Sequence, residues 1–131
     1  MRLAKYKKEN KELLTYLLFE AQDERSFVAG VKEEINDLFQ DLPTNTYYLK
    51  KTLRKILRHA NKQIKYSGIK ETELELRLCF CVHVKEANIP LQSSAVLNNM
   101  YQQQVKKIMA ALAKLPEDLQ ADYQREIDLI S

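Results

Sequence analysis

The sequence has very little glycine and proline, with two Gly and three Pro among 131 residues. A chain so poor in turn residues is not built from many short strands joined by hairpins, and long helices are the natural alternative. Gly30 and Gly68 also stand too far apart to form the glycine-rich loop of a dinucleotide-binding or P-loop protein. Nucleotide binding through either loop is therefore excluded.

Long apolar runs are missing as well. No run approaches the roughly 18 residues of a membrane-spanning helix, and the N-terminal stretch MRLAKYKKENKELL has no apolar signal core with a small-residue cleavage site. Cys79 and Cys81 are two positions apart and cannot form an ordinary disulfide framework, which fits a reducing compartment. These features predict a cytoplasmic protein without membrane insertion.

What is present is the composition of a folded domain. Apolar residues make up 45% of the chain and charged residues 30%, with seven Tyr and four Phe. This is typical of a globular rather than a disordered protein, and the length is sufficient for a conventional core. We therefore treat residues 1–131 as a single domain.

Apolar residues recur at helical spacing in the first half of the chain. They predict a first helix over residues 13–21, fading into polar residues, and a second from Val28 until Pro43 stops it. A third helix is expected after the TNT cluster at residues 44–46. Gly68 precedes an apolar residue, as a left-handed glycine at a helix C-terminus does, so the third helix is predicted to end there.

The stretch from Leu74 to Val84 alternates apolar and polar residues, which taken alone indicates a strand. No other stretch alternates in this way, so a strand here would have no partner within the chain. As a helix, the segment is apolar on nearly every side, as a central helix surrounded by others requires. Thr72 and Glu75 would form a capping box at its start. We therefore predict a fourth, central helix.

Two more helices are predicted in the last third of the chain. A fifth starts near Ser93 or Ser94, and Pro116 suits the first turn of a sixth. The expected fold is all-α, with about six helices in three consecutive hairpins. These would form either a helical bundle or a short α-α superhelical stack.

The third predicted helix concentrates positive charge. Residues 42–70 hold eight cations and no anion, whereas residues 1–41 hold seven cations and nine anions and residues 71–131 hold six and nine. On a helical wheel, four cations form a row opposite the apolar stripe and three more flank it. We call all seven the basic face. The row is Lys51, Lys55, Arg58 and Lys62, and the flanking residues are Lys50, Arg54 and Lys65.

The basic face has three interpretations. As a binding surface, it would contact a protein, or would contact phosphates with an affinity that falls steeply with salt. As a solvated surface, it would only keep the helix soluble, with Glu71, Glu73 and Glu75 returning near Lys62 and Lys65 as ordinary ion pairs. Binding to an anionic membrane is disfavoured, because the apolar stripe is needed for the core and Trp is absent.

The CFCVH stretch raises a metal or thiol hypothesis. Cys79 and His83 share one helical face, and His59 is a candidate third ligand from the preceding helix. Four tetrahedral ligands are not visible, however, and Cys79 and Cys81 point to different sides of a helix. We interpret both cysteines as small buried apolar side chains and predict no metal or cofactor. A thiol nucleophile paired with either histidine is the remaining enzyme hypothesis, which no catalytic motif supports.

Two stretches carry a resemblance. LRKILRHANKQIKYSGIKETELELRLCFCVHVKEANIP joins a basic helix, a glycine turn and a strongly apolar helix, and in LNNMYQQQVKKIMAAL a polar pair precedes a Tyr. From about Leu53 to Ile130, this order resembles a family of small all-helical bacterial proteins of unknown function. The resemblance implies that Leu74 to Val84 is helical, and it implies no activity.

The sequence therefore predicts a non-enzymatic binding or adaptor module whose basic face, on the helix around residues 46–67, contacts an acidic protein surface. Sequence-independent binding to a nucleic-acid backbone is the alternative. Tyr47, Tyr48 and Tyr66 lie at the helix ends rather than between the cations, so stacking on bases has thin support. A protein partner would also need apolar anchors beside the charges.

Overall fold

The computed structural model describes residues 13–131, with side chains from residue 22 onward. This part of the chain contains five α-helices, one short 3-10 helix and no strand, which confirms the all-α prediction. The helices are α2 (Leu13–Phe39), α3 (Thr46–Ser67), α4 (Lys70–Glu86), α5 (Ala95–Ala113) and α6 (Glu117–Ile130), with the 3-10 helix η1 (Leu91–Ser93) before α5. The predicted absence of a signal segment concerns mainly residues 1–12, which lie outside the described residues.

The first two predicted helices are one. α2 runs without interruption from Leu13 to Phe39, so the prediction of about six helices in three hairpins is wrong and the described residues contain five. The polar residues that follow the predicted first helix include Glu24, which is buried. Its carboxylate accepts hydrogen bonds from the hydroxyls of Ser67 and Thr72. The apolar pattern is therefore interrupted because Glu24 makes a buried polar contact, and the helix continues through it.

Both ends of α3 follow the usual capping rules. The side chain of Asn45 accepts hydrogen bonds from the backbone N–H groups of Tyr47 and Tyr48, which have no partner within the helix. At the other end, Gly68 adopts a φ of 70° and donates its N–H to the carbonyl of Ile64. The predicted glycine end of this helix is confirmed.

α4 is the central helix, as predicted, and contacts α2, α3, α5 and α6. Leu74, Leu76, Leu78 and Phe80 are all completely or almost completely buried. Successive residues of a helix differ by about 100°, so alternating apolar residues are spread around the helix and can meet neighbours on several sides. The helical interpretation of this stretch is confirmed.

The predicted capping box of α4 is wrong. The helix begins at Lys70 after Ile69, which makes no side-chain cap, so Thr72 and Glu75 lie inside the first turns. Thr72 donates its hydroxyl to Glu24, and Glu75 lies 2.9 Å from the ammonium of Lys32 on α2. Both residues fasten α4 to α2 instead of capping their own helix.

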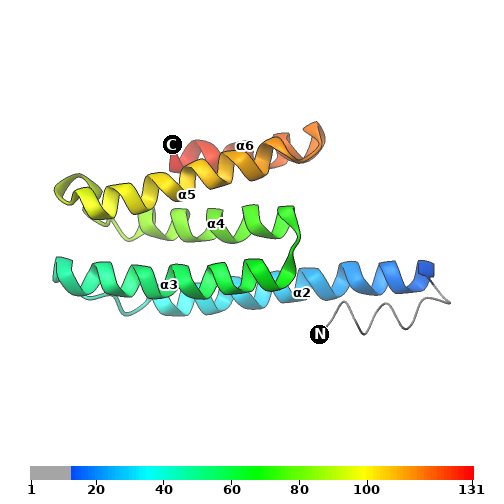
Figure 1. Ribbon diagram of the computed structural model, residues 1–131, viewed down its shortest axis with the longest axis horizontal. Coiled ribbons are helices and arrows are strands. Elements are labelled where there is room, and N and C mark those ends of the chain that lie inside the picture. The colour runs from blue at the N-terminus through cyan, green and yellow to red at the C-terminus, as the bar shows by residue number, and fades with distance from the viewer. Residues whose placement is uncertain (1–12) are drawn as a thin grey trace.

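The helices form a bundle around α4. Figure 1 shows α2 and α3 side by side on one side of α4, with α5 and α6 on the other. Ser94 caps α5 by accepting the N–H of Leu97, as predicted, and α6 starts directly after Pro116. Among the helices described, none has the length and apolar character that crossing a membrane requires. This arrangement leaves one face of α3 directed away from the core.

Candidate functional site

α3 divides into a buried side and an exposed side. Leu49, Leu53, Ile56, Leu57 and Ala60 are buried against the other helices. On the opposite side, six cations of the basic face are exposed and Lys50 is partly exposed. The predicted two-sided helix is therefore present, with the seven cations on a continuous surface.

The basic face has no acidic partner within the described part of the chain, where the ion pairs involve other residues. The expected pairs of Lys62 and Lys65 with the glutamates of α4 are not formed. The observed partners are Lys70 and Arg77 for Glu73, Lys32 for Glu75, and the Tyr123 hydroxyl for Glu71. The positive charge of α3 is consequently not neutralised by these carboxylates.

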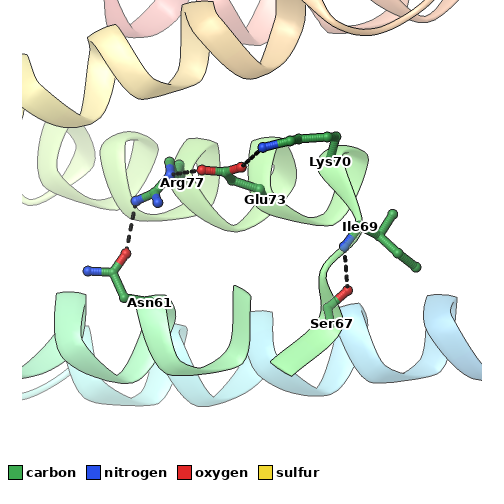
Figure 2. A network of polar contacts seen from close by, with 6 residues as sticks. All are labelled: Asn61, Ser67, Ile69, Lys70, Glu73 and Arg77. Carbon is green, nitrogen blue, oxygen red and sulfur yellow. Dashed lines mark hydrogen bonds and ion pairs between the residues drawn. The ribbon is translucent and has the colours of Figure 1, made fainter. Parts of the chain in front are cut away.

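Figure 2 shows where the carboxylate of Glu73 lies instead. Its two oxygens are 3.3 Å from the ammonium of Lys70 and 3.0 Å from Nε of Arg77. The guanidinium of Arg77, whose side chain is 8% exposed, also donates to Oδ1 of Asn61 on α3 and to Oε1 of Gln104 on α5. Burial raises the pKa of Glu73, but the hydrogen bonds and charges of Arg77 and Lys70 outweigh burial and lower it.

A groove of about 470 Å³ opens on the basic face. It is lined by Lys51, Arg54, Leu57, Arg58 and Asn61. Leu57 is 8% exposed and lies at the base, whereas the three cations are exposed around it. A groove with an apolar base and a cationic rim suits an apolar side chain flanked by carboxylates. Nothing in the sequence distinguished Leu57 from the other apolar residues of its stripe.

Three tyrosines lie beside the basic face. Tyr47 and Tyr48 are each 57% exposed and Tyr66 is 54% exposed, although all three are large and partly apolar. The ammonium of Lys51 lies 4.6 Å from the ring centroid of Tyr47, a cation–π contact. The tyrosines lie at the helix ends, as predicted, and supply exposed aromatic surface next to the charges.

The histidine nearest to a thiol is not placed to act as its base. Nδ1 of His83 lies 2.7 Å from the backbone oxygen of Cys79 and 3.6 Å from its Sγ. Because a carbonyl oxygen only accepts, Nδ1 carries its proton in this contact and cannot take one from the thiol. The other predicted histidine, His59, pairs with Glu34 of α2 at 2.9 Å.

Both thiols are also held in the protonated form. Burial raises the pKa of Cys79 to about 11 and that of Cys81 to about 12. A reactive cysteine needs the opposite shift, because the thiolate is the nucleophile and the metal ligand. Across the described residues, no group of three or more His, Cys, Asp or Glu side chains is arranged to hold a metal ion.

A larger groove of about 830 Å³ lies between α2, α4 and α6. Its carboxylates already have partners: Glu24 with two hydroxyls, Glu71 with Tyr123, and Glu75 with Lys32. These groups satisfy one another across four helices, so the contacts hold the helices together. The basic face of α3 is therefore the stronger candidate site.

Comparisons with known proteins add nothing to this geometry. No family model, curated protein or solved structure matches the chain. The resemblance to small helical bacterial proteins stays a prediction.

Proposed function

We propose that this protein is a non-enzymatic binding or adaptor module that holds an acidic protein surface against the basic face of α3. The observation that carries the proposal is the set of seven cations on α3, none of which pairs with an acid in the described residues. Such a concentration of positive charge attracts an acidic molecule and orients it as it approaches.

The groove and the tyrosines favour a protein as the partner. Protein interfaces combine an apolar centre with a charged and polar rim, and they are enriched in tyrosine and arginine. The basic face has both parts, with Leu57 at the base of the groove and Tyr47 and Tyr48 exposed beside Lys51. A phosphate backbone requires the cations and makes no use of an apolar groove.

Sequence-independent nucleic-acid binding is the second candidate. Its support is the row from Lys51 to Lys62, which extends about 16 Å along the helix at 1.5 Å per residue and so could meet several phosphates. Phosphate contacts predict strong binding to mixed sequences, with a loss of affinity between about 50 and 200 mM salt.

A labelled peptide separates the two candidates. We would measure fluorescence anisotropy with a helical peptide carrying Glu at every fourth position around a central Leu, and with a matched peptide carrying Gln in place of Glu. Mixed-sequence single- and double-stranded DNA and RNA would be titrated in parallel at about 50 and 200 mM salt. We expect the protein to bind the Glu peptide and to bind neither the Gln peptide nor the nucleic acids. A protein that binds nucleic acid but not the Glu peptide would contradict the proposal and make nucleic-acid binding the better candidate.

Two charge-reversal variants locate the binding surface. The α3 reversal changes Lys51, Lys55 and Arg58 to Glu. Its matched control changes three other exposed lysines to Glu: Lys106 and Lys107 on α5, and Lys114 directly after it. Both alter the net charge equally. We expect the α3 reversal to weaken peptide binding about tenfold or more and the control to change it little, since several charge contacts of up to about 1 kcal/mol each are reversed. Equal weakening in both variants would show that net charge alone attracts the peptide.

A further inference from the structure

α6 carries charge of the opposite sign to α3. Its sequence EDLQADYQREIDLI contains five acids and one base. The acids are Glu117, Asp118, Asp122, Glu126 and Asp128, and all five are exposed. None of them forms an ion pair with a cation of the described residues. Within the part of the chain that the structure describes, both the acidic helix α6 and the basic face of α3 are therefore without ion pairs.

The acidic face of α6 contains an exposed apolar residue. Leu129 is 63% exposed, more than the other large apolar side chains found at the surface of the described residues. At 100° per residue, Asp118, Asp122 and Leu129 lie within about 40° of one another on the helix, and Glu126 is three residues before Leu129. An exposed leucine flanked by carboxylates is the group that the groove on α3 suits.

We propose that the acidic partner of the basic face is a second copy of this chain, bound through the face of α6 formed by Asp118, Asp122, Glu126 and Leu129. Leu129 enters the groove above Leu57, and the carboxylates meet the cations of the rim. This inference rests on the proposed function, because it names the partner of the same site. Glu126 and Asp122 lie three and seven residues from Leu129, about 4.5 and 10.5 Å along α6, and Arg54 and Lys51 lie three and six residues from Leu57, about 4.5 and 9 Å along α3.

A contact between α3 and α6 requires two molecules. Figure 1 shows α3 and α6 on opposite sides of α4, so a folded chain cannot place its own α6 on its own α3. The contact between copies is therefore head to tail, and it leaves one free basic face and one free acidic face in every pair. Such an interface extends into chains or closes into a ring.

A second acidic row lies on α2 but lacks the apolar component. Glu33, Asp37 and Asp41 are exposed at or near its C-terminal end. No large apolar side chain is exposed among residues 22–39, the part of α2 with described side chains. Glu34, beside this row, is already bound to His59 of α3. The α2 row thus offers charge alone, and a reversal of its three acids serves as the matched control for α6.

Sedimentation velocity of the whole chain tests the proposal at about 50 and 500 mM salt over a range of concentrations. We expect association at low salt that is lost at high salt. The α3 reversal and an α6 reversal (Asp118, Asp122 and Glu126 to Lys) should each be monomeric alone. An equimolar mixture of the two should associate again, because the acidic α6 of the first fits the basic α3 of the second and the reversed faces fit each other.

Two further variants refine the result. Leu129→Ala should weaken self-association about tenfold, because it removes an apolar side chain from the groove and leaves the charges in place. The α2 reversal (Glu33, Asp37 and Asp41 to Lys) should associate like the wild type. Each variant is first checked for helical content. A charge reversal that unfolds the protein is replaced by a variant in which the same residues are changed to the neutral Gln or Asn.

The outcomes separate the inference from the proposed function. A wild type that stays monomeric at low salt, an α6 reversal that still associates, or a mixture that stays monomeric would overturn the self-association proposal. If the α3 reversal nevertheless abolishes binding of the Glu peptide, the proposed function stands and its partner is another protein. If the α3 reversal both self-associates and binds the peptide like the wild type, both proposals fall.

Discussion

Arg77 shows how a single buried side chain organises three helices. Its guanidinium is almost fully buried and contacts Glu73 on its own helix, Asn61 on α3 and Gln104 on α5. Gln104 is itself buried, and its side-chain oxygen accepts a hydrogen bond from the arginine. A buried polar group that loses its partner keeps the cost of leaving water and loses the compensation.

Replacing Arg77 by Met should therefore destabilise the fold although Met is apolar and of similar length. We expect the free energy of unfolding to fall by about 2–3 kcal/mol, less than the roughly 3–5 kcal/mol for breaking a fully buried ion pair, because Glu73 keeps some contact with water and its pair with Lys70. Urea denaturation followed by circular dichroism measures the change. Arg125→Met on the exposed face of α6 is the control and should stay within about 0.5 kcal/mol of the wild type. A similar stability for both variants would mean that the Arg77 contacts contribute little.

At the scale of the helices, the two glycines occupy opposite situations. Gly68 ends α3 with a φ of 70°, a conformation that costs a residue with a Cβ atom about 1 kcal/mol or more. Gly30 lies inside α2, where a Cβ atom would meet nothing within 4 Å and where glycine weakens the helix.

The same substitution should consequently have opposite effects at these positions. Gly68→Ala is expected to lower the melting temperature, and Gly30→Ala is expected to raise it, each by the equivalent of about 1 kcal/mol. Thermal melts followed at a helical circular dichroism band compare the two. A stabilising Gly68→Ala would show that the turn between α3 and α4 relaxes away from its left-handed conformation.

At the scale of the whole molecule, the contacts of α4 with the four other described helices should make unfolding a single transition. The amide protons of α4 around Leu76 and Phe80 are expected to exchange only through global unfolding. Hydrogen exchange resolved by residue would then give these amides the same free energy as urea denaturation. Faster exchange in α4 than in α3 or α6 would contradict a central role for this helix.

The arrangement of the core could be predicted from sequence because its signals are local. The apolar stripe of α3, the glycine at its end and the apolar circumference of α4 all depend on residues within a few turns. Glu24 was misinterpreted because its partners Ser67 and Thr72 are more than forty residues away. Periodicity describes which side of a helix is apolar and carries no information on which distant hydroxyl a buried carboxylate meets.

The candidate site shows the same limit. The seven cations and their common face followed from helical spacing alone, and their exposure agrees with it. What the sequence did not reveal is that the glutamates of α4 turn toward Lys32, Lys70 and Arg77, or that Leu57 forms the base of a groove. Both depend on how α3 and α4 are placed against their neighbours.

The order of contacts between helices also has a consequence for the speed of folding. Each described helix packs against the next one along the chain, and α4 adds contacts with α2 and α6, two elements away on either side. The contacts between consecutive helices close short loops, so little chain entropy is lost before they form. We therefore expect a low contact order and rapid folding, with α4 and its two neighbours providing an early nucleus onto which α2 and α6 add.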